Sequence, residues 1–290
     1  MLKVWIEAMR LRTLPVSLAG VIYAGALGLL TDCFSLMPWV LALLFALLAQ
    51  IASNFANEYF DFRAGLDRPG REGPRRGVTE GDIAPRAMLG AALGTLAAAC
   101  AIGVALVAIW GQWWMYVAGV AVALGVLAYS TGPYPLSHHG LGEVAVVIFF
   151  GIVPVSLTYM LMGGLCHYWV MAAAVGVGLM GANVLMVNNY RDADDDCAVG
   201  KQTLAVKLGR AAVSNLYLAS GYLAAMLTLP EWIAVARWGW ICPCVYAVAH
   251  TILYGMLRAR KGQALNPLLG VTAVLMLLYS LAFAAAVALG

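Results

Sequence analysis

Two clusters of acidic and amide side chains interrupt a chain that is otherwise apolar. The first lies in NFANEYFDFRAGLDRPGREGPRRG, residues 54–77, and the second in MVNNYRDADDDCAVGKQT, residues 186–203. Each cluster follows a long apolar run, so we expect each at the end of a helix. Residues three, four and seven positions apart share one face of a helix. The spacing therefore predicts two polar stripes, one made of Asn54, Asn57, Glu58 and Asp61 and the other of Asn188, Asp192 and Asp196.

The two stripes share the pattern Asn-x-x-x-Asp, which begins at Asn57 in the first and at Asn188 in the second. The repetition is compatible with an internal duplication and equally with chance. Ionisable groups at membrane depth are costly and indicate a functional site. The alternative is that both stripes are solvated helix ends. Solvated helix ends seldom align Asn and Asp on one face in two separate helices. They also seldom place Arg and Lys beside these acids, because the opposite charges would neutralise each other.

The residue types in the clusters are suited to a metal-bound phosphate. Mg²⁺ prefers carboxylate and amide oxygens, takes one or two carboxylates, and often fills its other positions with substrate phosphates. Arg and Lys nearby complete a phosphate site. Gly65 permits a turn that would bring Asp67 back to the first stripe. Beside apolar helices, such a site predicts a substrate with a polar head and a membrane-soluble tail, and a polyprenyl diphosphate fits that description.

The segments that must position these clusters are typical of an integral membrane protein. Of the 290 residues, 63% are hydrophobic and only 11% are charged, which is too little charge for a soluble domain. About 20 apolar residues cross the hydrocarbon core of a bilayer. We expect no cleavable signal peptide, and the six Cys show no zinc-binding spacing. Nine helices are predicted, near residues 13–31, 36–60, 86–110, 113–130, 141–163, 167–190, 211–229, 237–257 and 267–289.

The basic residues are distributed unequally between the two sides that nine helices define. Of 17 Lys and Arg residues, 16 lie on the N-terminal side, in the N-terminal segment and in the loops after the second, sixth and eighth helices. Only Arg237 lies opposite. The positive-inside rule then predicts a cytoplasmic N-terminus, an external C-terminus and a location in the inner membrane of the cell. Both acidic clusters would face the cytoplasm.

Four stretches together resemble a known family. These are RLRTLPVSLAGV (10–21), NFANEYFDFRAGLD with the following GPRRG, YSTGPYPLSHHGLGEVAVVIFFG (129–151) and NNYRDADDDCAVGKQTLAVKLGR (188–210). They resemble the UbiA superfamily of membrane prenyltransferases over essentially the whole chain. The likeness is strongest to the 1,4-dihydroxy-2-naphthoate polyprenyltransferases of menaquinone synthesis. One departure is Glu58, where the family pattern has Asp.

The resemblance implies an all-α integral membrane fold, with nine helices around a central cavity, a cap of cytoplasmic loops and a lateral opening for the lipid tail. Residues 1–290 would form one polytopic domain. The repeated Asn-x-x-x-Asp pattern is compatible with a four-helix pseudo-repeat of helices 1–4 and 5–8. The implied reaction is Mg²⁺-dependent transfer of a polyprenyl group from its diphosphate to 1,4-dihydroxy-2-naphthoate. Diphosphate and CO₂ are released and demethylmenaquinone is formed.

The resemblance also implies roles for individual residues. One Mg²⁺-diphosphate half-site would consist of Asn57, Glu58, Asp61 and Asp67, and the other of Asn188, Asp192 and Asp196. The diphosphate would be contacted by Arg71, Arg75, Arg76 and Lys201. The candidate rings for facing an allylic cation are Tyr129, Tyr134 and Tyr190. The alternative for each of them is a packing or interface role. His138 and His139 are either acceptor-binding or solvated, and Glu143 is either structural or acceptor-facing. Asp194 and Asp195 fall off the second stripe and are the least favoured acids.

Other functions are compatible with parts of this pattern. A transporter or channel more often places ionisable residues at mid-bilayer, whereas the mid-span positions here are almost purely apolar by sequence. A CDP-alcohol phosphatidyltransferase needs an Asp-Gly-x-x-Ala-Arg run, which is absent. Within the superfamily, 4-hydroxybenzoate prenyltransferase, haem O synthase and chlorophyll synthase are the alternatives. No nucleic-acid partner is expected, the surrounding partner is membrane lipid, and the sequence fixes neither prenyl chain length nor oligomeric state.

Overall fold

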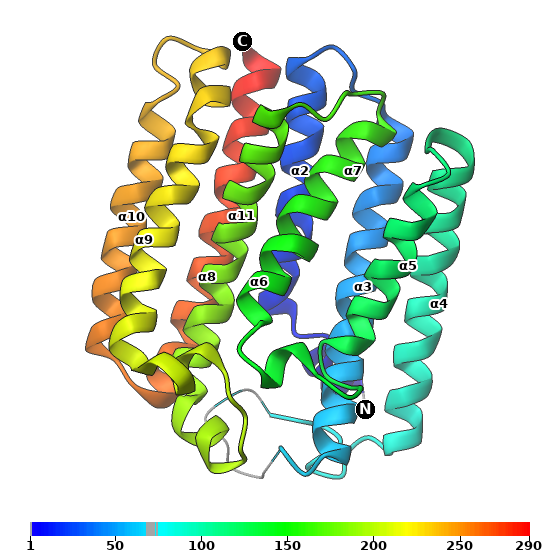
Figure 1. Ribbon diagram of the computed structural model, residues 1–290, viewed down its shortest axis with the longest axis vertical. Helices are drawn as coiled ribbons and strands as arrows, with labels where there is room; N and C mark the ends of the chain where they lie inside the picture. The colour runs from blue at the N-terminus through cyan, green and yellow to red at the C-terminus, as the bar shows by residue number, and fades with distance from the viewer. Residues whose placement is uncertain (1, 68–72, 74) are drawn as a thin grey trace.

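The computed structural model describes residues 2–67, 73 and 75–290, and this part of the chain is helical with no β-strand. The helices stand side by side as an upright bundle, with the N-terminus at the lower end and the C-terminus at the upper end (Figure 1). The first half contains α1 Leu2–Ala8, η1 Leu11–Thr13, α2 Leu14–Leu30, α3 Leu36–Arg63, α4 Pro85–Trp110, α5 Met115–Ala128 and η2 Leu136–His138. The second half contains α6 Gly142–Val146, η3 Val147–Ile152, α7 Val153–Leu161, α8 Tyr168–Ala198, α9 Leu204–Val235, α10 Ile241–Ala259, η4 Gly262–Leu265 and α11 Asn266–Leu289.

The chain is a multi-pass membrane protein. Within the described residues, eight helical segments are long and apolar enough to cross a bilayer, with α1–α2, α6–α7 and η4–α11 each counted as one segment. Helix α5 is apolar but shorter, and it occupies the place of the fourth predicted span. The predicted total of nine spans therefore depends on whether α5 crosses the membrane, and it stays a prediction.

The two helices that carry the acidic stripes run further than the hydropathy pattern indicates. Helix α3 ends at Arg63 rather than near residue 60, and α8 ends at Ala198 rather than near residue 190. Hydropathy marks where a helix leaves apolar surroundings, whereas the backbone stays helical through the polar stripe. After α3 the predicted turn is present, since Gly65 has a φ of 69° and the Leu66 N–H donates to the Asp61 carbonyl.

The segment predicted as one helix over 141–163 is three consecutive helices. The π-helix η3 separates α6 from α7, and Pro154 lies in the first turn of α7. A methyl group on Gly151 would collide with the Ala174 carbonyl oxygen and the Gly178 backbone, so η3 and α8 are in backbone contact here. The sequence pattern gave no indication of this π-turn, which turns Phe149 and Phe150 toward the interior described below.

Helix α8 is the most enclosed element and packs against α2, α6, η3, α9 and α11. Helices α8, α9 and α10 nevertheless contain single buried polar residues among their apolar ones. Asn183, Glu231 and His250 are all buried within these helices. Ser220 donates to the Asn183 side-chain oxygen at 2.6 Å, and His250 Nε2 lies 2.8 Å from the Tyr217 carbonyl oxygen. Averaged hydropathy hides single polar residues of this kind, which join neighbouring helices inside a membrane bundle.

Candidate active site

A polar cavity of about 170 Å³ lies where the ends of α3 and α8 meet the loops at the lower end of the bundle. The first acidic cluster contributes Asn57, Asp61 and Arg76 to its wall, and the second contributes Asn188, Asp192, Asp196 and Lys201. The structure thus brings both predicted clusters to one cavity, although 131 residues separate Asn57 from Asn188 (188 minus 57). The identities of the residues that bind metal or substrate stay a prediction.

Asp61 is the carboxylate that joins the two clusters. It is 2% exposed, and its Oδ2 accepts a hydrogen bond from Lys201 Nζ at 3.1 Å. His138 Nε2 lies 3.6 Å from Asp61 Oδ1, which accepts no hydrogen bond from the described residues. A buried carboxylate beside a lysine and a histidine keeps its charge and can still bind a further cation or donor.

Arg76 is buried among three carboxylates of the first cluster. Its guanidinium nitrogens lie 3.3 Å from Asp67 Oδ2, 3.7 Å from Asp61 Oδ2 and 4.0 Å from Glu58 Oε2. Glu58 also accepts a hydrogen bond from the Val78 backbone N–H at 3.0 Å. Glu58 and Asp67 do not line the polar cavity. In this structure these two predicted metal ligands instead face Arg76 and the loop that carries it.

Arg191 organises the second cluster. Its Nε and Nη2 donate to the two carboxylate oxygens of Asp192 at 2.6 and 2.7 Å, and Nη2 also donates to Asn188 Oδ1 at 2.8 Å. Nη1 donates to Asn266 Oδ1 at 2.7 Å, which ties α8 to the start of α11. Such bidentate pairing fixes both the position and the orientation of a carboxylate. From the sequence alone, Arg191 is only one of the basic residues beside the second cluster.

The loop between α5 and α6, residues 129–141, lies at the lower end of the cavity. Gln202 N–H donates to the His138 carbonyl at 2.9 Å, and Lys207 Nζ donates to the His139 carbonyl at 2.6 Å. These bonds join the loop after α5 to the loop after α8. Tyr134 stacks on His139, with ring centroids 3.7 Å apart, and is 54% exposed. Of this loop, Ser137 rather than Tyr134 lines the cavity.

Several predicted substrate contacts lie away from the cavity wall. Arg75 is half exposed and forms an ion pair with Asp82. Tyr190 lies under the Arg210 guanidinium, whose carbon is 5.8 Å from the ring centroid. Arg71 lies outside the described residues. The predicted roles of these residues in binding stay predictions.

Arg10 lines the cavity from the turn between α1 and η1, and residue spacing alone did not single it out. Its backbone has a left-handed φ of 53°, which is costly outside glycine and tends to occur at functional sites. Thr13 holds this turn by donating its hydroxyl to the Arg10 carbonyl at 3.0 Å. Asn54 holds it from α3 by donating to the Met9 carbonyl at 2.9 Å. The Arg-x-x-Thr spacing is therefore the signal that could have identified the turn.

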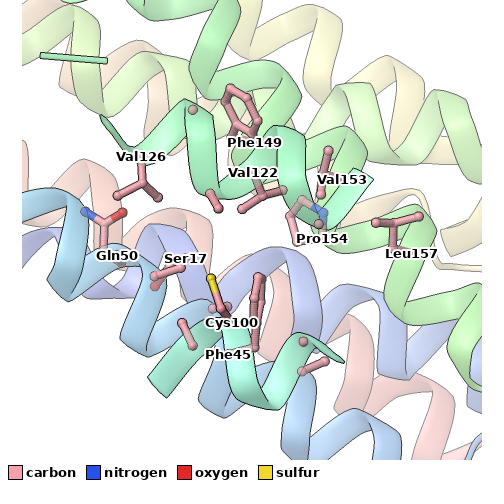
Figure 2. Close-up of a pocket in the computed structure, with 18 of the residues that line it drawn as sticks. Ser17, Phe45, Gln50, Cys100, Val122, Val126, Phe149, Val153, Pro154 and Leu157 are labelled. Atoms are coloured by element: carbon pink, nitrogen blue, oxygen red, sulfur yellow. The ribbon is translucent and has the colours of Figure 1, made fainter. Parts of the chain in front are cut away.

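A second cavity, of about 310 Å³ and lined almost entirely by apolar residues, lies among α2, α3, α4, α5 and α7. Figure 2 shows Phe45 and Cys100 on one side of it and Val122, Phe149 and Leu157 on the other. The two cavities have five wall residues in common, Gln50, Ser53, Tyr129, Val146 and Phe150. Tyr129 follows α5 directly and lies at the junction of the two cavities.

The donor set of the polar cavity fits Mg²⁺ bound together with a phosphate. No group of three or more His, Cys, Asp and Glu with metal-site geometry occurs among the residues that the structure describes. Mg²⁺ does not require such a group when substrate phosphates and water supply the remaining oxygens. Asp61 Oδ1, buried and without a donor from the described residues, is the kind of hard oxygen that the ion binds.

Comparisons with known proteins agree with this architecture. The profile of the UbiA prenyltransferase family matches residues 15–268. The 1,4-dihydroxy-2-naphthoate octaprenyltransferase of Mycobacterium tuberculosis is 35% identical over 99% of this chain and 97% of its own length. The enzyme of the same name from Escherichia coli is 32% identical over 82% of this chain and 79% of its own length.

Solved structures of UbiA homologs share the fold, and two of them are described here by their likeness to this chain. A UbiA homolog from Archaeoglobus fulgidus bound to DMAPP and Mg²⁺ superposes with a TM-score of 0.67 at 15% identity, over 97% of this chain and 99% of that one. The apo UbiA homolog from Aeropyrum pernix K1 gives a TM-score of 0.71 at 17% identity, over 95% and 97% of the two chains. At this level of identity the likeness concerns the fold alone.

Proposed function

This chain belongs to the UbiA prenyltransferase family, and on that basis we propose that it transfers a polyprenyl group from a polyprenyl diphosphate to 1,4-dihydroxy-2-naphthoate. The names of its relatives support the naphthoate as acceptor. The bound molecules of the Archaeoglobus homolog support an allylic diphosphate and Mg²⁺ as the donor complex. The products are diphosphate, CO₂ and demethylmenaquinone in its reduced, quinol form. These relatives do not favour a 4-hydroxybenzoate acceptor or a transport function.

The observation that carries the proposal is the junction of a charged cavity with an apolar one. A diphosphate fits the charged cavity and a prenyl tail fits the apolar one. The allylic carbon that joins them then lies near the shared residues Gln50, Tyr129 and Phe150. A transporter would need a path for a polar solute between two membrane faces, whereas the larger cavity here is almost entirely apolar.

The residues of the charged cavity divide into three proposed groups. Lys201 and Arg76 contact the diphosphate and stabilise the negative charge that grows on it as the carbon–oxygen bond breaks. Glu58 and Asp67 hold Arg76 in position. Mg²⁺ would supply further neutralisation of the leaving oxygens, and the residues suited to hold it with the diphosphate are Asn57, Asp61, Asn188, Asp192 and Asp196.

The reaction balances without any further reactant. The bond between the allylic carbon and the diphosphate oxygen breaks, and both electrons leave with the diphosphate. A ring carbon of the naphthoate supplies the electron pair for the new carbon–carbon bond. Loss of CO₂ from the carboxylate then leaves the electron pair of the broken carbon–carbon bond in the ring, which restores aromaticity and gives the neutral quinol. The loops joined through His138 and Gln202 cover the site and limit the access of water to the allylic cation.

We also propose that the polar cavity faces the cytoplasm, in the inner membrane of the cell. The distribution of Lys and Arg supports this orientation, since 16 of 17 fall on the side that contains both acidic clusters. A cytoplasmic opening would give the water-soluble acceptor direct access to the site.

The proposal is tested by offering the purified protein, in detergent with added lipid, equal concentrations of 1,4-dihydroxy-2-naphthoate and 4-hydroxybenzoate with one polyprenyl diphosphate. We expect prenylated naphthoate as the main product, formed only when Mg²⁺ is present. A clear preference for the benzoate would contradict the assigned acceptor. Absence of transfer to either acceptor would contradict the proposed activity.

A further inference from the structure

Glu143 is a buried glutamate next to the junction of the two cavities. It lies in the first turn of α6 and is 6% exposed. Its Oε1 accepts a hydrogen bond from Asn189 Nδ2 at 2.8 Å, and its Oε2 accepts none from the described residues. A buried carboxylate is expensive to maintain in a membrane protein, so its retention calls for a function.

Asn189 connects this glutamate to the polar cavity, whose wall it forms together with its neighbour Asn188. The side-chain oxygens of the other three asparagines of this wall already accept hydrogen bonds, Asn54 from Gln50, Asn57 from Ser130 and Asn188 from Arg191. No described residue donates to the side-chain oxygen of Asn189. Its amide nitrogen is engaged by Glu143, so the oxygen is the polar atom that it can offer to a ligand.

An asparagine side chain can present either its oxygen or its nitrogen, because the two ends have nearly the same shape. A carboxylate removes this ambiguity, because it accepts hydrogen bonds and cannot donate them. Opposite Glu143, Asn189 must therefore direct its nitrogen toward α6 and its oxygen away from it. The pair sets the polarity of one point on the cavity wall.

We propose that Asn189 accepts a hydrogen bond from a ring hydroxyl of the aromatic acceptor, and that Glu143 is a positioning residue that holds Asn189 in the required orientation. The inference rests on the proposed function, because the diphosphate needs cationic partners whereas a phenol donates its hydroxyl proton. Positive charge develops on a ring hydroxyl as the ring attacks the allylic carbon. The hydrogen bond from that hydroxyl to a fixed acceptor is therefore stronger in the transition state than in the ground state.

The test exchanges the polarity of the pair. Glu143→Gln allows the Asn189 amide to rotate, and we expect kcat/KM for the acceptor to fall about three- to tenfold, the size of one lost hydrogen bond. Asn189→Asp sets two carboxylates against each other, and we expect a fall of at least about tenfold. In the double variant the introduced amide donates to the introduced carboxylate, whose second oxygen is again an acceptor. We expect its kcat/KM to return to within about threefold of wild type.

The KM for the polyprenyl diphosphate is the second readout, and we expect it to change less than about twofold in all three variants, because the pair makes no contact with Lys201 or Arg76. Glu231→Gln is the matched control, since Glu231 is equally buried within a span but does not line either cavity. It is expected to keep the acceptor KM of wild type. A merely structural role for Glu143 would lower the melting temperature without this rescue.

Two outcomes would overturn the inference. One is a double variant whose defect is the sum of the two single defects or larger. The other is a change in the diphosphate KM as large as that in the acceptor KM. If Asn189→Asp fails to fold, the inference is tested by comparing Glu143→Gln with the double variant. A double variant that is no more active than Glu143→Gln would overturn it. Failure of the proposed function is recognised separately, because it would be seen in the wild-type protein. If the wild-type protein prenylates 4-hydroxybenzoate instead, the same variants are tested with that acceptor. If it prenylates neither acceptor, both proposals are overturned.

Discussion

At the scale of single residues, the site depends on carboxylates whose positions are fixed by cationic side chains. Asp61 is bound by Lys201, and Asp192 is bound by Arg191. Asp194 and Asp195, which belong to the same acidic run as Asp192, are exposed on the other side of α8. Helical spacing therefore separates acids that the sequence places next to each other.

This separation gives a paired prediction. Asp61→Asn removes the charge that Lys201 and His138 face, and we expect the rate of prenyl transfer to fall at least about 100-fold. Asp194→Asn is the control, because the Asp194 side chain is 87% exposed and pairs with the partly exposed Arg210. Its rate should stay within about twofold of wild type. Initial rates in membranes, corrected for the amount of protein, check both. Wild-type activity in Asp61→Asn would contradict the role of Asp61.

Residue types and spacing were enough to predict the two stripes, the turn at Gly65 and the pairing of the clusters at one cavity. They were not enough to identify Arg10, Arg191 or the pair of Glu143 with Asn189. The contacts of these residues join segments far apart in the sequence, such as the 75 positions between Arg191 and Asn266. Periodicity reports which face a residue shares with its near neighbours and carries no information about such partners.

At the scale of elements, the π-helix η3 is the feature that shapes the interior. It lies against α8 through Gly151 and Gly178, and Phe150 from this turn lines both cavities. π-turns inside α-helices often occur at functional sites. The sequence signal for the contact is two glycines in separate spans, which is too common in membrane helices to be specific.

Gly151→Ala is therefore expected to destabilise the protein, by about 1–3 kcal/mol, because the added methyl group collides with the α8 backbone. Gly94→Ala is the control, since open space surrounds Gly94 in α4. There the substitution should be neutral or stabilising by up to about 1 kcal/mol. Thermal unfolding of both variants in the same detergent provides the comparison. Equal melting temperatures would contradict the close contact of η3 with α8.

The apolar cavity leads to a prediction about tail length. Leu157 of α7 lies at the end of the cavity opposite Gln50 (Figure 2). Leu157→Trp should fill that end and shift the preference of the enzyme toward shorter prenyl diphosphates. Leu223→Trp, on a part of α9 that lines neither cavity, should leave the preference unchanged. Competition between diphosphates of different length, with analysis of the products, measures the shift. An unchanged product distribution in Leu157→Trp would place the tail elsewhere.

At the scale of the whole molecule, both acidic clusters lie at one end of the bundle and the C-terminus lies at the other (Figure 1). Composition predicts the membrane class. Hydropathy predicts most helix positions, because a helix needs about 20 apolar residues to cross the hydrocarbon core of a bilayer. The predicted duplication of a four-helix unit stays a prediction. The parallel placement of α3 and α8, each ending in an Asn-x-x-x-Asp stripe, is the feature that supports it.

The proposed orientation can be tested with introduced cysteines, in a variant whose six native Cys are replaced. Glu80→Cys labels the charged end, and Leu165→Cys labels the opposite end, where Leu165 is 71% exposed. In intact cells, a membrane-impermeant maleimide should react at position 165 and not at position 80. Inverted vesicles should give the reverse pattern. Reaction at position 80 from outside would contradict a cytoplasmic active site.

The central claim is that cleavage of an allylic diphosphate in the polar cavity is coupled to decarboxylative prenylation of the naphthoate at the junction. Its most direct test measures three products from the same reaction of purified protein, Mg²⁺, polyprenyl diphosphate and carboxyl-labelled 1,4-dihydroxy-2-naphthoate. We predict equimolar formation of diphosphate, CO₂ and prenylated quinol, and none of the three after the metal is chelated. Release of diphosphate without prenylated product, or prenylation with the label retained, would contradict the account.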